Sequence, residues 1–156
     1  MKQRILAILA LATMVPALYL IFIYAPIEVT QGNVQRIFYF HVPLATSGYV
    51  SAALMFIGSL MYLIKRDLKW DRFGAAAGEM GVVFISAQLW TAVHWAKPVW
   101  RIWYAFDSRG TLQLVLYLIF IASVMLRAYL PEREKQAKLG AVFGILAMID
   151  VPFNYL

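Results

Sequence analysis

The sequence has no cysteine and only two histidines among its 156 residues. The lack of cysteine excludes disulfides, thiol nucleophiles and thiolate metal ligands. Charged residues are also scarce, at 14% of the chain, where a soluble domain has about a quarter. Hydrophobic residues make up 63%, which is more than a soluble chain of this length can bury in one core. The composition therefore indicates a membrane protein.

Five apolar stretches are long enough to cross a bilayer, which takes about 20 predominantly apolar residues in a helix. We expect these spans at about 5–25, 42–64, 73–93, 111–128 and 139–156. The first has a basic start like a secretory signal, but its apolar run exceeds the roughly 7–15 residues of a signal core, so we expect it to be retained. The predicted fold is all-α: a polytopic transmembrane helical bundle in which residues 1–156 form a single membrane domain.

The basic residues predict how the bundle is oriented. Ten Lys and Arg lie at the N-terminus and in the segments 65–72 and 127–138, against four in the segments 26–41 and 94–110. Because basic loops stay in the cytoplasm, we expect a cytoplasmic N-terminus in the cytoplasmic (inner) membrane, with 26–41 and 94–110 as outer loops on the periplasmic or extracellular face. The net charge of +6 comes from these loop clusters, so we expect lipid and not nucleic acid as the surrounding partner.

Two glycine pairs predict close helix contacts. They are Gly74-x-x-x-Gly78 in the third span and Gly140-x-x-x-Gly144 in the fifth. Small residues one turn apart let helix backbones approach each other within a membrane. The pairs favour a compact bundle and carry no indication of function.

Aromatic residues gather in the second outer loop. They are Trp95, Trp100, Trp103, Tyr104 and Phe106, and they alternate with Lys97, Arg101 and Arg109. Trp and Tyr commonly form belts at the membrane surface. Flat rings beside cations also suit a flat aromatic ligand that carries carboxylates. The residues alone leave both interpretations open.

His41 lies at the start of the second span, on the same expected face as the aromatic loop. A histidine at a membrane interface is often a hydrogen-bonded structural residue. Imidazole is also a usual axial ligand of haem iron. A single ligand on that face would contact both His41 and the aromatic loop.

Together these segments resemble the haem-handling protein family of cytochrome c maturation, whose outer loops carry a Trp-rich WWD signature and a His-Val-Pro-x-Ala motif. The first pattern is matched by Trp95-Ala-Lys-Pro-x-Trp-x-x-Trp-Tyr-x-Phe-Asp-x-Arg109, and the second by His41-Val-Pro-Leu-Ala45. The resemblance runs along nearly the whole chain in span order and loop placement.

The resemblance implies a function that is not enzymatic. The family holds haem b on the outer face and delivers it to a membrane-anchored haem chaperone of the CcmE type, with an ABC transporter of the CcmAB type acting on the complex. His41 maps to the first axial ligand of the haem iron. The aromatic platform maps to Trp95, Trp100, Trp103, Tyr104, Phe106 and Asp107, and the possible propionate contacts are Lys97, Arg101 and Arg109.

Several departures from the family pattern are visible. Tyr104 and Phe106 stand where the family more often has Trp, Arg101 stands where Gly is typical, and Gly110 replaces the usual Leu. The family has six spans and a second axial histidine in a third outer loop, and we expect this chain to be a fragment that stops before both. His94 either replaces that second ligand or is an incidental interfacial residue.

Two acidic residues inside expected spans leave other functions open. Glu79 lies about one-third of the way into the third span and Asp150 lies in the fifth. Carboxylates at this depth are paired or protonated, or they mark an ion path. The alternatives to haem delivery are therefore a small ion or solute transporter that uses Glu79 and Asp150, and a membrane assembly subunit without a haem site.

Overall fold

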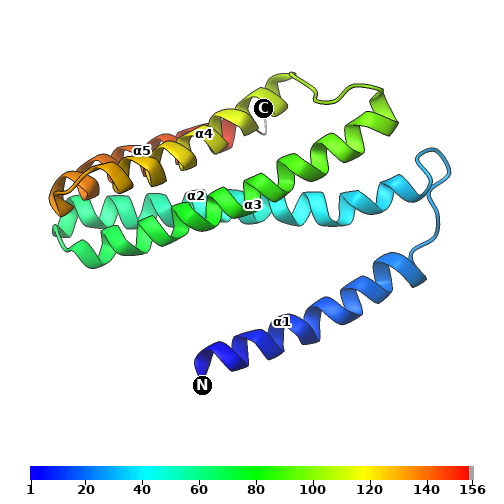
Figure 1. The fold of residues 1–156 in the computed structure, drawn as a ribbon, viewed down its shortest axis with the longest axis horizontal. Helices are drawn as coiled ribbons and strands as arrows, with labels where there is room; N and C mark the ends of the chain where they lie inside the picture. Colours follow the sequence, from blue (N-terminus) through cyan, green and yellow to red (C-terminus); the bar gives the residue numbers. More distant parts are fainter. Residues whose placement is uncertain (155–156) are drawn as a thin grey trace.

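The computed structural model describes residues 1–154, which form helices joined by short connections (Figure 1). The helices are α1 (Lys2–Tyr19), continued by a π-helical turn η1 (Leu20–Tyr24), the 3-10 helix η2 (Asn33–Ile37), α2 (Phe38–Lys65), α3 (Leu68–Trp100), α4 (Ser108–Tyr129) and α5 (Arg133–Phe153). Five helical segments are long and apolar enough to cross a membrane. The expected all-α transmembrane bundle is therefore confirmed, except that residues 155–156 of the fifth expected span lie outside the described part.

Helices α2 and α3 form a long antiparallel hairpin with a two-residue turn. Arg66 takes a left-handed conformation at φ 55°, and its N–H donates to the Tyr62 carbonyl. Asp67 then caps α3 by accepting the Lys69 N–H at 2.9 Å. The segments Asn33–Lys65 and Leu68–Trp100 each contain 33 helical residues, about 50 Å at the α-helical rise of about 1.5 Å per residue. Because the hydrocarbon layer is only about 30 Å thick, the hairpin extends beyond it.

The expected outer loops 26–41 and 94–110 are partly helical, which corrects the sequence-based boundaries. Residues 94–100 form the last turns of α3, and α2 already begins at Phe38. The helices continue because their ends pack on each other. Ala96 is buried, and the rings of Phe38 and Trp95 lie 6.0 Å apart. The predicted span ended at residue 93 because the hydropathy of the sequence falls there. The helix itself continues to Trp100.

The bundle core is narrow and depends on small residues. Both predicted glycine pairs are confirmed as contact points, since all four glycines are buried. A methyl group on Gly58 would lie 2.7 Å from the Cα of Gly74, so α2 and α3 touch along their backbones. A methyl group on Gly81 would lie 2.5 Å from the Phe120 ring of α4. Larger residues at these positions would force the helices apart.

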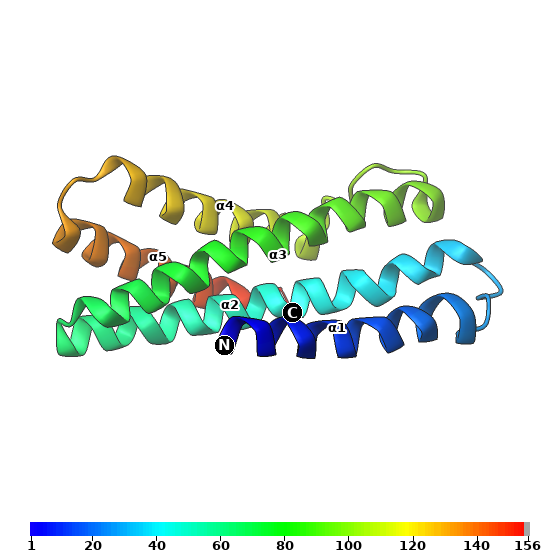
Figure 2. The same ribbon diagram turned by 60° about the horizontal axis from the view of Figure 1, so that its bottom comes forward.

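Helix α1 stands apart from the other helices. None of its residues Lys2–Tyr19 is buried, and in Figure 1 it diverges from α2 toward its N-terminal end. It is tied to the bundle near its connection to α2, where the Phe22 and Phe40 rings lie 6.2 Å apart and the Arg36 guanidinium lies 5.9 Å from the Phe22 ring centre. In the view of Figure 2, α1 runs along α2 at the edge of the molecule, with α3 and α4 on the other side of α2.

A buried ion pair joins α3 to α4 at the end of the bundle where the hairpin turns. Arg127 binds Asp71 through two nitrogens, at 2.5 and 3.1 Å, and the two side chains are only 16% and 9% exposed. Gln136 of α5 donates to the Arg127 backbone carbonyl at 3.0 Å. The interaction therefore connects three helices.

We expect Asp71→Ala to lower the free energy of unfolding by about 3–5 kcal/mol, because it leaves the Arg127 guanidinium buried without its counterion. Thermal unfolding of purified protein in detergent measures the change. Lys135→Ala serves as the matched control, since the Lys135–Glu132 pair is 61% and 60% exposed and such pairs contribute about 0–1 kcal/mol. Equal unfolding temperatures for both variants would show that the buried pair does not hold the helices together.

Candidate functional site

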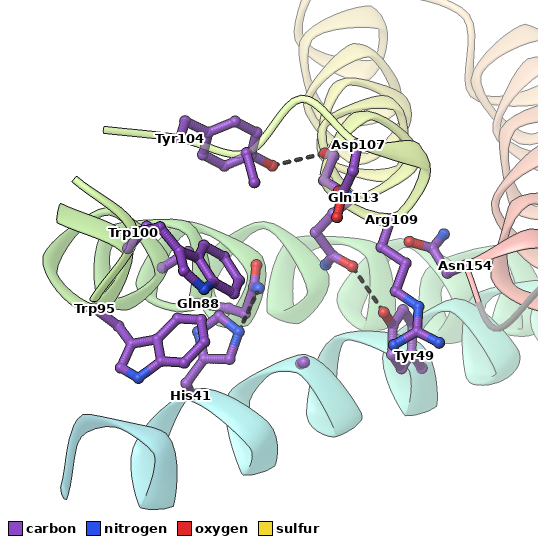
Figure 3. A pocket seen from close by; sticks show the side chains of 15 residues that line it. His41, Tyr49, Gln88, Trp95, Trp100, Tyr104, Asp107, Arg109, Gln113 and Asn154 are labelled. Atoms are coloured by element: carbon purple, nitrogen blue, oxygen red, sulfur yellow. Dashed lines mark hydrogen bonds between the residues drawn. The ribbon is translucent and has the colours of Figure 1, made fainter. Parts of the chain in front are cut away.

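A half-open cavity of about 300 Å³ lies between the far ends of α2 and α3 and the start of α4 (Figure 3). Helices α2–α5 and the connection from α3 to α4 all contribute to its lining. The lining residues are His41, Ala45, Tyr49, Gln88, Ala92, Trp95, Ala96, Trp100, Tyr104, Ala105, Asp107, Arg109, Gly110, Gln113 and Asn154. Its volume is at the lower end of the range of about 300–1,000 Å³ that ligand pockets span.

His41 is held at the cavity wall by two residues of α3. Its Nδ1 lies 3.1 Å from the Thr91 hydroxyl oxygen, and its Nε2 lies 3.2 Å from the Gln88 amide nitrogen. The Thr91 hydroxyl donates to the Gln88 carbonyl at 2.7 Å, so its oxygen is left to accept the His41 Nδ1–H. Nε2 then carries the lone pair and accepts from the Gln88 amide. The hydrogen-bond network thus selects the tautomer whose Nε2 can bind a metal.

Three polar atoms in the cavity wall are buried without a hydrogen-bond partner. They are Gln88 Oε1, Gln113 Nε2 and Asn154 Oδ1, and only Arg36 and Arg127 have such atoms elsewhere in residues 1–154. The Gln113 amide oxygen is satisfied by the Tyr49 hydroxyl, which donates to it at 2.8 Å. Folded proteins pair nearly all their buried polar groups. The gathering of unpaired atoms around one cavity therefore indicates a place for a polar ligand or water.

Two indole rings form the aromatic side of the cavity. The Trp95 and Trp100 rings meet edge to face, with their centres 4.5 Å apart. Trp95 Nε1 donates to Gln31 Oε1 at 3.0 Å, which ties α3 to the connection between α1 and α2. In that connection the backbone N–H of Gln31 donates to the Glu28 carboxylate, and this hydrogen bond is the main cause of the lowered pKa of Glu28. The turn at Glu28 therefore helps to fix Trp95.

Residues 101–107 close the cavity from the α4 side. The Tyr104 hydroxyl donates to the Gly110 carbonyl at 2.6 Å, and burial, with a smaller contribution from the Asp107 charge, raises the pKa of Tyr104 to about 12. Asp107 caps α4 by accepting the Gly110 N–H at 2.7 Å. A side chain on Gly110 would collide with the Ala105 carbonyl. The Leu typical of the resembled family would therefore not fit this tight connection.

The structure brings only some of the expected site residues to the cavity. His41, Trp95, Trp100, Tyr104, Asp107 and Arg109 line it. Trp103 and Phe106 lie outside the lining, with exposed fractions of 65% and 76%. Lys97 also lies outside, with its ammonium 4.3 Å from the Trp103 ring centre, and Arg101 is an exposed residue at the end of α3, at φ 59°.

The three other expected polar candidates, His94, Glu79 and Asp150, also lie outside the cavity lining. The exposed His94 packs on Trp90, with ring centres 4.0 Å apart, and its Nδ1 donates to the Trp90 carbonyl at 2.8 Å. Glu79 lies exposed on the outer face of α3. Asp150 is buried and accepts a hydrogen bond from Asn154 Nδ2 at 2.7 Å. The two carboxylates thus do not share one surface of the bundle.

The sequence-based reasoning missed several polar residues of this site. Gln88 and Thr91 lie about one turn apart on α3, and Gln113 lies on α4. The available signal was that glutamine is rare inside apolar spans and, when present, faces the bundle interior. That signal identifies the glutamines, whereas the contacts of Gln88 and Thr91 with His41 and the position of Gln113 in the same cavity depend on how the helices are rotated against each other.

The fold is that of a polytopic membrane protein, with a cavity at one end of its helical bundle. The sequence profile of the CcmC family, described as heme exporter protein C, matches residues 1–156. The chain therefore belongs to this family.

Individual relatives support the assignment. The chain is 29% identical over 136 residues to a putative cytochrome c biosynthesis ccmC-like mitochondrial protein of Marchantia polymorpha, covering 87% of this chain and 57% of that protein. It is 28% identical over 129 residues to heme exporter protein C of Escherichia coli K12, covering 83% and 53%. For heme exporter protein C of Rhodobacter capsulatus the identity is 29% over 142 residues, covering 86% and 59%. The chain thus spans little more than half the length of these relatives.

The hydrogen-bond network predicts the tautomer of His41. We expect the neutral Nδ1–H form, with an unprotonated Nε2, and Thr91→Val should shift the population toward the Nε2–H form by removing the acceptor of Nδ1–H. Nitrogen-15 NMR of histidine-labelled protein measures this directly, because the chain has only two histidines and His94→Gln assigns the pair. An Nε2–H signal for His41 in the unaltered protein would contradict the network.

Proposed function

We propose that the chain binds haem b at this cavity, on the outer face of the cytoplasmic membrane, and delivers it during cytochrome c maturation. The observation that carries the proposal is the position of His41, which lines a cavity walled by Trp95 and Trp100 and whose Nε2 carries the lone pair that accepts from the Gln88 amide. Imidazole nitrogen is a common haem iron ligand. Membership of the CcmC family supports the same function.

The residues present fit a porphyrin in three ways. His41 Nε2 would hold the iron. The Gln88 amide, which now donates to Nε2, would then have to move away from it. The indole rings of Trp95 and Trp100 offer an apolar surface for the macrocycle. Arg109 lines the cavity beside Tyr49 (Figure 3) and would pair with a propionate. We assign the propionate role to Arg109, because Lys97 and Arg101 lie outside the lining.

The cavity is open on one side, which suits a ligand that is passed on. A volume of about 300 Å³ encloses part of a large flat ring and leaves the remainder accessible to a partner. Within residues 1–154, His41 is the only histidine that lines the cavity. The proposal therefore assigns one axial position of the iron to this part of the chain.

The geometry of the hairpin supports placing the site at the outer face. The cavity lies at the end of α2 and α3 remote from their connecting turn, and that turn carries the basic cluster expected in the cytoplasm. A hairpin longer than the hydrocarbon layer supports a position of the cavity at the membrane surface. We propose the hand-over of haem to a chaperone of the CcmE type, together with a CcmAB-type transporter, and no chemical conversion by the chain itself.

The test is haem binding by purified protein. His41→Ala should weaken haem affinity at least about tenfold and diminish the Soret band, since the iron loses its ligand from this chain. Trp100→Ala should also weaken affinity, by about 0.5–1.5 kcal/mol, because it removes one aromatic wall of the cavity. Titration of haem in detergent, followed by absorbance, measures both.

Two matched controls come from residues outside the lining. His94→Ala and Trp103→Ala should bind haem as the unaltered protein does, because both side chains are turned away from the cavity. Equal losses in His41→Ala and His94→Ala would refute the assignment of the ligand. Equal losses in Trp100→Ala and Trp103→Ala would mean that the exposed aromatic residues, and not the cavity, hold the porphyrin.

A further inference from the structure

A carboxylate is exposed on the outer surface of α3 at a depth where the helix crosses the hydrocarbon. Glu79 is exposed, and among residues 1–154 it has neither a hydrogen bond nor an ion pair. The same face of α3 carries Phe73, Met80, Val83 and Trp90, which are 43–64% exposed. This is the apolar face that a spanning helix presents to its surroundings, with one acidic residue within it.

The depth of Glu79 in the membrane follows from the residues at the two ends of this apolar face. Arg72 stands at one end and the interfacial Trp90 at the other, 18 residues apart in the helix, which corresponds to about 27 Å and matches a hydrocarbon layer of about 30 Å. Glu79 is seven residues from Arg72, or about 10 Å into the layer. A glutamate side chain is too short to reach the surface from there. Ionisable residues inside membranes normally face the bundle interior and are paired, and Glu79 is not.

A groove runs beside Glu79, between α2 and α3. It has a volume of about 410 Å³, and Ala76 and Met80, which flank Glu79 in the helix, belong to its lining. Its α2 side is formed partly by the small residues Thr46, Ser47 and Ser51. Small side chains along a groove allow another transmembrane helix to approach closely. The surface thus combines a groove lined partly by small residues with an unpaired acid beside it.

Residues 1–156 offer no cation for this acid at its depth. None of the 14 Lys and Arg lies in the segments 5–35, 37–64, 73–96, 110–126 or 139–156. Helix α1 and a second copy of residues 1–156 in the same orientation would therefore both lack a basic residue at the depth of Glu79. The nearest basic residue in the spans, Arg127, is already paired with Asp71.

We propose that the face formed by Glu79 and this groove is the docking site for a transmembrane helix of a partner subunit that carries an arginine or lysine at matching depth. The partner helix fills the groove, and its cation neutralises the carboxylate away from water. The inference does not depend on haem binding, because the face lies outside the cavity lining.

The proposal is tested by disulfide crosslinking in lipid vesicles, which has no background because the chain has no cysteine. Val83→Cys places a thiol one turn from Glu79 on the same face. The probe is a synthetic polyleucine helix of about 20 residues with one arginine about 10 Å from its end and one cysteine a turn further in. The comparison peptide has leucine in place of arginine.

We expect the arginine peptide to crosslink about tenfold more than the leucine peptide, and Glu79→Leu to remove the difference. Glu79→Gln should retain a smaller preference through hydrogen bonding. Leu118→Cys, on the exposed face of α4, is the matched control and should crosslink equally little to both peptides. Circular dichroism of Glu79→Leu checks that the variant is folded, which we expect because the residue makes no contact to lose.

Equal crosslinking of both peptides at Val83→Cys would overturn the proposal and leave Glu79 as a carboxyl group that faces lipid. An arginine preference that survives Glu79→Leu would overturn it as well, since the preference would then come from another group. Loss of haem binding in His41→Ala alters neither result, so this proposal and the haem site fail independently.

Discussion

The close contact between α2 and α3 is the constraint on which the rest of the structure depends. Gly58 and Gly74 let the two backbones touch, and the two-residue turn at Arg66 and Asp67 fixes their relative position along the axis. With that register fixed, His41 at the start of α2 meets Gln88 and Thr91 near the end of α3. The position of His41 against Gln88 and Thr91 is therefore set by contacts near the opposite end of the hairpin.

The same contact explains how a small chain holds a precise polar site. The hydrogen bond from the Thr91 hydroxyl to the Gln88 carbonyl leaves Thr91 able to accept from His41 Nδ1, and the orientation of the imidazole follows. Trp95 is held in turn by Gln31. His41 and Trp95 are therefore each held by a partner on another element, as binding residues that need a defined geometry require.

Composition and hydropathy were sufficient to predict five helices, because a span needs only length and apolarity. Counting the spans also predicted that His41 and Trp95 lie on the same face of the membrane. The direction in which individual side chains point could not be predicted in this way, because it depends on the rotation of each helix and on the residue at which α3 ends. The sequence therefore could not separate Trp100, which lines the cavity, from Trp103, which is outside it, and it could not show that Glu79 faces outward.

The central claim is that His41 Nε2 binds the iron of haem at this cavity. Pulsed electron paramagnetic resonance of protein with nitrogen-15 histidine, loaded with ferric haem, detects a coordinated imidazole nitrogen directly. The account predicts a histidine nitrogen coupling in the unaltered protein and in His94→Gln, and its loss in His41→Gly. A coupling that persists in His41→Gly and disappears in His94→Gln would contradict it.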